Sequence, residues 1–168
     1  MTARVDAERD LALQGRYAGA VTRLGAYLVD ATAVTLLFAA GSATVQFVVR
    51  DVLGIDFDLA DVAGLAAVAA VIWTFVYFAV PLAASGRTLG SAVWGLRVVR
   101  ADGRDLDAAH AVLRTVAMPL SFLVFGLGLL LILVHPAQRA LHDLIADTAV
   151  VYAWDARAAR LRFMSRDA

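Results

Sequence analysis

The sequence predicts an all-α membrane protein with two transmembrane helices, a third apolar segment that is re-entrant or broken, and a small cytoplasmic β element. Long apolar runs, an uneven distribution of arginines and two short β-prone runs support this prediction. Of the 168 residues, 61% are hydrophobic and 18% are charged, whereas soluble domains have about 45–50% apolar and about 25% charged residues. Because the excess is concentrated in runs, it indicates contact with lipid.

Two apolar runs are long enough to cross a bilayer. The first covers residues 24–49 and contains one ionisable group, Asp30, and the second covers residues 62–84. At about 1.5 Å per residue, each run spans the roughly 30 Å of hydrocarbon in a membrane. Basic and acidic residues alternate before the first run, so we expect an uncleaved anchor rather than a secretory signal.

The arginines predict how these helices are oriented. Four arginines precede the first span and five lie in residues 85–114, whereas residues 50–61 hold one arginine and four aspartates. Cytoplasmic loops carry the excess of basic residues. We therefore expect a multi-pass protein of the inner or plasma membrane, with a cytoplasmic N-terminus and residues 50–61 outside.

The third apolar run, residues 115–134, has two possible courses. It contains Pro119, Gly126 and Gly128. A single crossing places the following arginine-rich tail outside, against the charge rule, whereas entry and return with a bend at the glycines keeps it inside. Broken helices are tolerated where neighbouring protein covers their free backbone groups. The re-entrant course is favoured, and the single crossing stays open.

Two short runs predict the β element. Residues 96–100 read Leu-Arg-Val-Val-Arg and are followed by the turn signal Asp102-Gly103, and residues 148–152 read Thr-Ala-Val-Val-Tyr. Isolated strands need partners, so we expect these two to pair, which requires that both lie on the same side of the membrane. The alternative is that both are loops.

Three short segments carry a resemblance to a known family. They are residues 17–30, 86–103 and 139–151, and their characteristic positions are Arg23, Asp30, Thr88, Gly90, Gly95, Arg97, His142, Asp143 and Thr148. In order and spacing they resemble the RDD family of bacterial membrane proteins, which is named for one arginine and two aspartates. The resemblance identifies those three residues as Arg23, Asp30 and Asp143.

The resemblance covers about residues 16–153, so it implies a membrane domain at 17–153, a cytoplasmic N-terminal segment at 1–16 and an arginine-rich tail at 154–168. It also implies a transport-related role, since some members are linked to sodium–proton exchange. The family often has Lys directly after the second glycine of the middle segment, where this chain has Ser91. A contact made by that Lys is therefore not carried over.

Asp30 is the most informative residue, because a carboxylate inside a span costs about 2.5–3.5 kcal/mol on insertion scales. It is either a site for a monovalent cation or proton, or a structural acid paired with an arginine. Arg23 lies two helical turns away, about 10.5 Å along the axis, which is too far for a direct bond. We expect Asp143 to pair with Arg23, and Arg114 to pair with Asp30.

Several function classes find no support in the sequence. There is no Cys and there are three His, so we expect no thiolate chemistry, no metal site and no cofactor. The net charge of zero gives no case for nucleic acid, and the chain carries no catalytic constellation, so we do not expect an enzyme. Small residues in the spans favour close helix packing, most of it within the chain. Because two spans and a re-entrant segment enclose little volume, we also expect a homo-oligomer or a complex with other membrane subunits.

The prediction is thus a small transport protein that handles a cation or proton at Asp30, with Asp143 as a second candidate. The alternative is a non-catalytic accessory subunit of a larger membrane complex.

Overall fold

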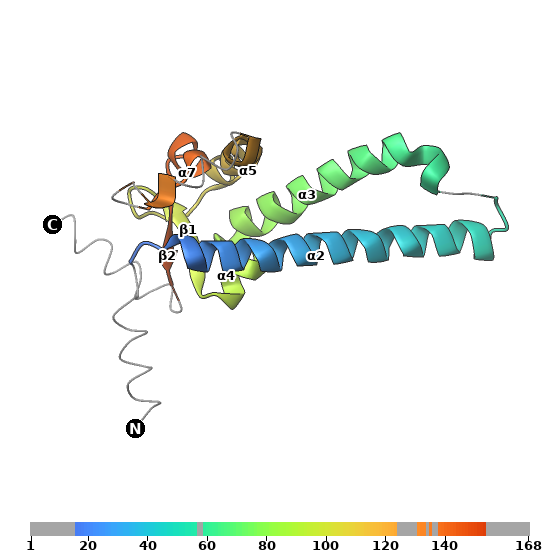
Figure 1. The fold of residues 1–168 in the computed structure, drawn as a ribbon, viewed down its shortest axis with the longest axis horizontal. Helices are drawn as coiled ribbons and strands as arrows, with labels where there is room; N and C mark the ends of the chain where they lie inside the picture. Colours follow the sequence, from blue (N-terminus) through green and yellow to red (C-terminus); the bar gives the residue numbers. More distant parts are fainter. Residues whose placement is uncertain (1–15, 57–58, 124–130, 134, 136–137, 154–168) are drawn as a thin grey trace, which may run out of the picture.

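The computed structural model describes residues 16–56, 59–123, 131–133, 135 and 138–153. Its longest elements form a helical hairpin in which α2 (Ala20–Phe47) runs outward, and α3 (Ala63–Ser85) returns beside it (Figure 1). A π-helical turn, η1 (Val48–Val52), extends α2, and a 3₁₀ turn, η2 (Leu59–Val62), leads into α3.

Both hairpin helices are long and apolar enough to cross a membrane, as the sequence predicts. Their large apolar side chains are widely exposed; Leu36 is 64% and Val71 is 70% accessible. Such extended apolar surface is unfavourable in water and marks contact with lipid or another protein.

The end of α3 is set by Gly86, which adopts a left-handed conformation (φ 68°) and donates its N–H to the Leu82 carbonyl. Glycine takes this conformation without strain, which is why it is common just after helices. The chain then turns into the short helix α4 (Leu89–Val93), and the Thr88 hydroxyl accepts a hydrogen bond from the Ser91 N–H at its start.

The predicted strand pair is confirmed. β1 (Leu96–Arg100) and β2 (Thr148–Tyr152) form an antiparallel two-stranded sheet, with Val98 opposite Val150. The chain just before α2 lies along the free edge of β2: Ala18 N–H donates to the Val150 carbonyl (2.8 Å), and Tyr152 N–H donates to the Arg16 carbonyl (2.9 Å).

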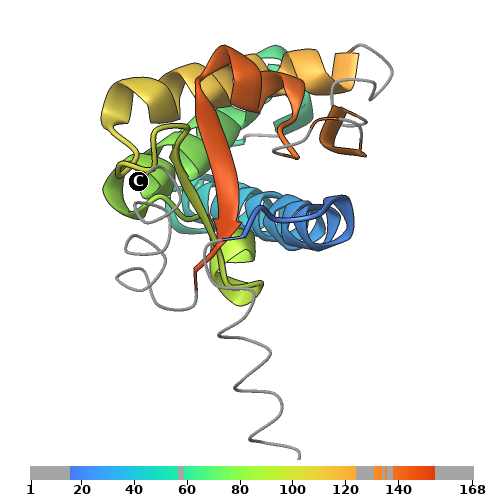
Figure 2. The same cartoon turned by 90° about the vertical axis from the view of Figure 1, so that its left-hand side faces the viewer.

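The described part of the connection between the strands includes two helices that position the site. These are α5 (Ala108–Leu123) and α7 (Leu141–Ile145), which pack against each other, and α5 also packs on α3. They lie on the side of the structure opposite α4 (Figure 2). Helix α5 begins seven residues before the apolar run and continues through Pro119. The proposed bend at Gly126 and Gly128 falls outside the described residues.

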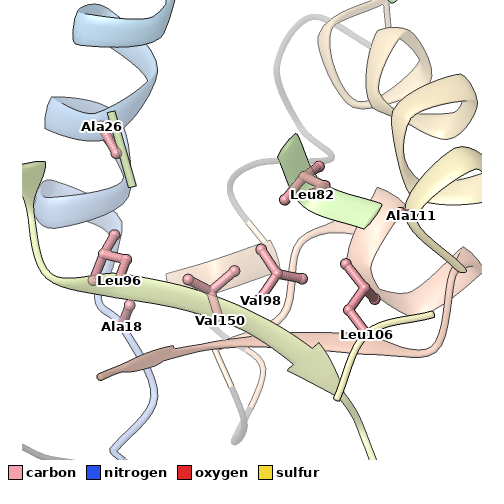
Figure 3. Close-up of a cluster of buried hydrophobic side chains, with 8 residues drawn as sticks. All are labelled: Ala18, Ala26, Leu82, Leu96, Val98, Leu106, Ala111 and Val150. Atoms are coloured by element: carbon pink, nitrogen blue, oxygen red, sulfur yellow. The ribbon is translucent and has the colours of Figure 1, made fainter. Parts of the chain in front are cut away.

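A small apolar core holds this end of the hairpin together. It joins the start of α2, the end of α3, the sheet and the start of α5 through Ala18, Ala26, Leu82, Leu96, Val98, Leu106, Ala111 and Val150 (Figure 3). The sheet and the short helices thus form a cap on one end of the α2–α3 hairpin, and the polar residues singled out by the sequence converge there.

Candidate functional site

The centre of the cap is a buried carboxylate held by two arginines. The Nη1 atom of Arg23, on α2, contacts Oδ2 of Asp143. The Nη1 atom of Arg114, on α5, contacts Oδ1 of the same carboxylate. All three residues are buried, with 0–3% of each accessible. The sequence correctly placed Arg23 against Asp143, and the structure adds Arg114 as a second partner.

Helix α7 positions this carboxylate. Asp143 lies in the first turn of α7, and its Oδ2 also accepts a hydrogen bond from the backbone N–H of Ala140, at the start of the helix (2.9 Å). A carboxylate at this position satisfies a free N–H group and interacts favourably with the positive end of the helix dipole.

The beginning of β2 is bound into the same cluster. Arg114 donates to the Thr148 hydroxyl (3.1 Å), and Arg139 donates to the backbone carbonyls of Thr148 (2.8 Å) and Asp143 (3.2 Å). Arg139 also pairs with Asp147 at the surface. The closing segment of the sequence signature therefore fixes α7 to the sheet.

His142 connects the cluster to α5 and α2. The Ser121 hydroxyl accepts a hydrogen bond from the His142 backbone N–H (3.2 Å) and also lies 2.8 Å from the His142 ring nitrogen Nδ1. The Tyr27 hydroxyl lies 3.1 Å from the other ring nitrogen, Nε2. Both ring nitrogens of His142 therefore have a hydroxyl partner.

The imidazole of His142 is neutral. Burial, reinforced by the positive charges of Arg114 and Arg23, lowers the pKa of His142 to about 2. The cluster of Arg23, Arg114, His142 and Asp143 therefore carries two positive charges and one negative charge. Within the described part of the chain, Arg23 Nη2 and Arg114 Nε have no hydrogen-bond partner.

Asp30 forms a second, separate site about two turns beyond Arg23 along α2. Its Oδ1 accepts hydrogen bonds from the Tyr77 hydroxyl (2.9 Å) and the Gly90 N–H (2.7 Å), and its Oδ2 accepts one from the Thr88 hydroxyl (2.6 Å). Asp30 is 1% accessible, so it points into the protein as expected.

The expected pairing of Asp30 with Arg114 is wrong. Arg114 binds Asp143 and Thr148 instead, because α5 approaches the hairpin on the side opposite α4. Among the described residues, Asp30 has no ion pair, and all three of its donors are neutral groups.

The middle segment of the signature explains how α4 reaches Asp30. A Cβ atom on Gly90 would overlap the Ala26 carbonyl oxygen and lie 2.8 Å from Asp30 Cγ, so only glycine fits there. The Thr88 hydroxyl caps α4 and lies 2.8 Å from the Ser91 hydroxyl. Ser91, which replaces the Lys often found in the family, thus extends the hydroxyl group network around Asp30.

The remaining signature residues shape the sheet. Gly95 has φ 62° at the turn into β1, and Arg97 on β1 pairs with the half-exposed Asp105 at 3.3 Å. Both lie away from the two buried carboxylates.

Three site residues were not singled out from the sequence: Tyr27, Tyr77 and Ser121. Each lies inside an apolar run, where an aromatic residue or a serine is compatible with simple packing. The hydroxyl groups of these residues could have indicated a polar site, because buried polar groups are nearly always hydrogen-bonded to a partner.

No group of three or more metal-ligating side chains occurs among residues whose placement is described.

Comparisons with known proteins agree with the signature. The sequence profile of the RDD family matches residues 17–147. An uncharacterized protein of Bacillus subtilis (strain 168), YckC, is 38% identical over 78 residues, which are 44% of this chain and 52% of YckC. The matched part thus spans about half the length of that relative. No solved structure matches the chain significantly. Because the family profile covers most of the sequence, including Arg23, Asp30 and Asp143, the chain belongs to the RDD family, whose members are membrane proteins.

Proposed function

We propose that this protein is a multi-pass transport protein of the inner or plasma membrane, in which Asp30 binds a monovalent cation or a proton. Its membrane placement is supported by the family and by the exposed apolar faces of α2 and α3. Residues 85–114, which hold five arginines, and the sheet lie at one end of the hairpin, which the charge rule assigns to the cytoplasm.

This placement favours the re-entrant course for residues 115–134. The chain leaves the sheet after Arg100 and returns to it at Thr148. A segment that starts and ends on one side of a membrane crosses it an even number of times or not at all. A single crossing would place the two paired strands on opposite sides of the membrane, so the strand pairing supports the re-entrant course.

One observation carries the proposed transport role: Asp30 is a buried carboxylate surrounded by neutral hydrogen-bond donors, with no ion pair among the described residues. Ionisable residues buried inside membrane helices commonly mark ion and proton pathways. The hydroxyl groups of Tyr77 and Thr88 donate to the carboxylate, and by rotating they also offer lone pairs to a cation. The site thus has an uncompensated negative charge and oxygen ligands.

Asp143 has a different role in this proposal. Two arginines contact its carboxylate, so the net charge around Asp143 is positive and does not favour a cation. Asp143 serves instead to hold α2, α5 and α7 together at the cap, and of the two candidate acids only Asp30 is left to bind an ion.

The alternative is an accessory subunit that docks onto other membrane proteins. It is favoured by the three donors at Asp30, which also stabilise a permanently ionised, structural carboxylate. In that case the exposed faces of α2 and α3 form the docking surface.

Flux into proteoliposomes that contain only the purified protein separates these functions. The wild type is expected to show cation-dependent proton movement, and Asp30→Asn, which preserves shape but cannot exchange a proton, is expected to abolish it. Asp51→Asn, at the exposed far end of the hairpin, is the matched control and should retain flux. Wild-type flux that persists in Asp30→Asn contradicts the ion site, and absence of wild-type flux favours the accessory role.

A further inference from the structure

A cavity of about 820 Å³ lies between α2, α3 and α5. Its size is typical of ligand-binding pockets, which range over about 300–1,000 Å³. Most of its walls are aliphatic or aromatic, including Ala31 and Val34 on α2, Phe75 and Phe78 on α3, and Met118 on α5. Walls of this composition favour an apolar occupant.

The cavity is reached from the outer apolar surface of the helices. Val71, Val116 and Phe122 line it and are nevertheless 70%, 60% and 50% accessible. If α2 and α3 cross a bilayer, the medium in contact with these side chains is lipid hydrocarbon.

One end of the cavity borders the arginine cluster. Tyr27 forms part of the wall, and its hydroxyl contacts His142, while Thr115, also in the wall, directly follows Arg114. The cluster carries one excess positive charge, since Arg23 and Arg114 face a single carboxylate and His142 is neutral. Asp30, which carries the balancing charge, lies about 10 Å further along α2.

We propose that this cavity binds one acyl chain of an anionic phospholipid, with the headgroup toward the arginine end. The proposal rests on the membrane placement made under the proposed function, but not on ion transport. The apolar walls select the chain. Arg23 and Arg114 are buried behind the wall rather than in it, so their excess charge favours an anionic headgroup through its electrostatic field and not through direct contact. A free phosphate ion fits only the charged end, and an uncharged alkane only the walls.

Photo-crosslinking in proteoliposomes tests this binding. Phosphatidylglycerol and phosphatidylcholine that carry a diazirine in one acyl chain are compared, and labelled peptides are mapped by mass spectrometry. We expect labelling of Met118 and Phe78 on the cavity walls, and this labelling should be about fivefold stronger with the anionic lipid. That is the preference expected for about one effective basic charge.

Ala70→Phe and Ala31→Phe, which fill the cavity from α3 and α2, should abolish wall labelling. Ala69→Phe, on the opposite face of α3, should leave it unchanged.

The remaining outcomes contradict the proposal in distinguishable ways. Labelling of exposed Leu36 and Leu37 without labelling of the cavity walls shows that the helices contact lipid and that the cavity does not bind it. Labelling of neither region refutes the membrane placement as well. Equal labelling by both lipids refutes the headgroup assignment. Asp30→Asn should not affect labelling, so loss of flux in that variant leaves this proposal intact.

Discussion

Arg23 at the start of α2 and Asp143 on α7 are 120 positions apart in the sequence and form a buried ion pair. The pair joins α2 to α7, the helix that precedes β2. Arg114 binds the other oxygen of the same carboxylate, so three separate segments depend on one side chain.

Removing Asp143 should therefore destabilise the protein strongly. Asp143→Ala leaves Arg23 and Arg114 buried without a counter-charge, and breaking a buried pair from one side costs about 3–5 kcal/mol. We expect a large fall in folded yield and in the midpoint of thermal unfolding in detergent. Adding Arg23→Ala should recover part of the loss, because it removes one stranded charge.

A surface ion pair provides the comparison for this experiment. Asp105→Ala removes the partner of Arg97, but Asp105 is half-exposed, and such pairs contribute about 0–1 kcal/mol. Equal effects of Asp143→Ala and Asp105→Ala would contradict the structural role assigned to the cluster.

Because α4 approaches α2 closely at Gly90, we expect a larger side chain at this position to destabilise the protein. In Gly90→Ala the new methyl group collides with the Ala26 carbonyl and with Asp30, and overpacking of this kind costs about 1–3 kcal/mol, sometimes more. Thermal unfolding should show a clear loss of stability. Gly41→Ala, in the middle of α2 with open space around it, should instead stabilise by up to about 1 kcal/mol.

Tyr77 tests how the carboxylate of Asp30 is held. Tyr77→Phe keeps the ring and removes one of the three hydrogen-bond donors; hydrogen bonds to charged groups contribute about 1.5–3 kcal/mol. The unfolding midpoint should fall in this variant. Thr44→Val also deletes a hydroxyl, but one that bonds only to its own helix at an exposed position, so it should have little effect. If the two substitutions have equal effects, Tyr77 does not stabilise Asp30.

His142 predicts how stability depends on pH. Its pKa is lowered from 6.5 to about 2 in the folded protein, so between these values the unfolded chain binds a proton that the folded protein excludes. Stability is therefore complete above about pH 6.5 and decreases as the pH falls, by about 1 kcal/mol per unit once the unfolded histidine is protonated.

Thermal unfolding measured between pH 7 and pH 5 checks this dependence, since the aspartates remain mostly ionised over that range. In His142→Asn the unfolding midpoint should depend less on pH, although the variant will be less stable than the wild type at every pH. His110→Asn, at the surface-accessible start of α5, should preserve it. A wild-type midpoint that does not change with pH would refute the buried neutral imidazole.

Much of the cap could be predicted from the sequence. The β-prone runs at 96–100 and 148–152 gave the strand bounds correctly, because short β-branched segments flanked by turn residues have few other structures available. The Arg23–Asp143 pair followed from placing both residues at the same membrane boundary.

The environment of Asp30 could not be derived in the same way. Charge alone suggested an arginine partner, whereas its donors are two hydroxyl groups and a backbone N–H on α3 and α4. The N–H of Gly90 becomes available only because a residue without Cβ lets α4 approach α2 closely, and that approach is a tertiary property. The start of α5 was likewise missed, since its first turns are not part of the apolar run.

Infrared difference spectroscopy of the purified protein in lipid tests most directly whether the Asp30 carboxylate exchanges an ion or proton. When sodium replaces choline, or when the pH is stepped at constant salt, the wild type should show a change in a carboxylate stretching band. The band should be absent in Asp30→Asn and retained in Asp51→Asn. A wild-type spectrum without such a change, or an identical change in Asp30→Asn, would contradict the account and leave Asp30 as a structural residue.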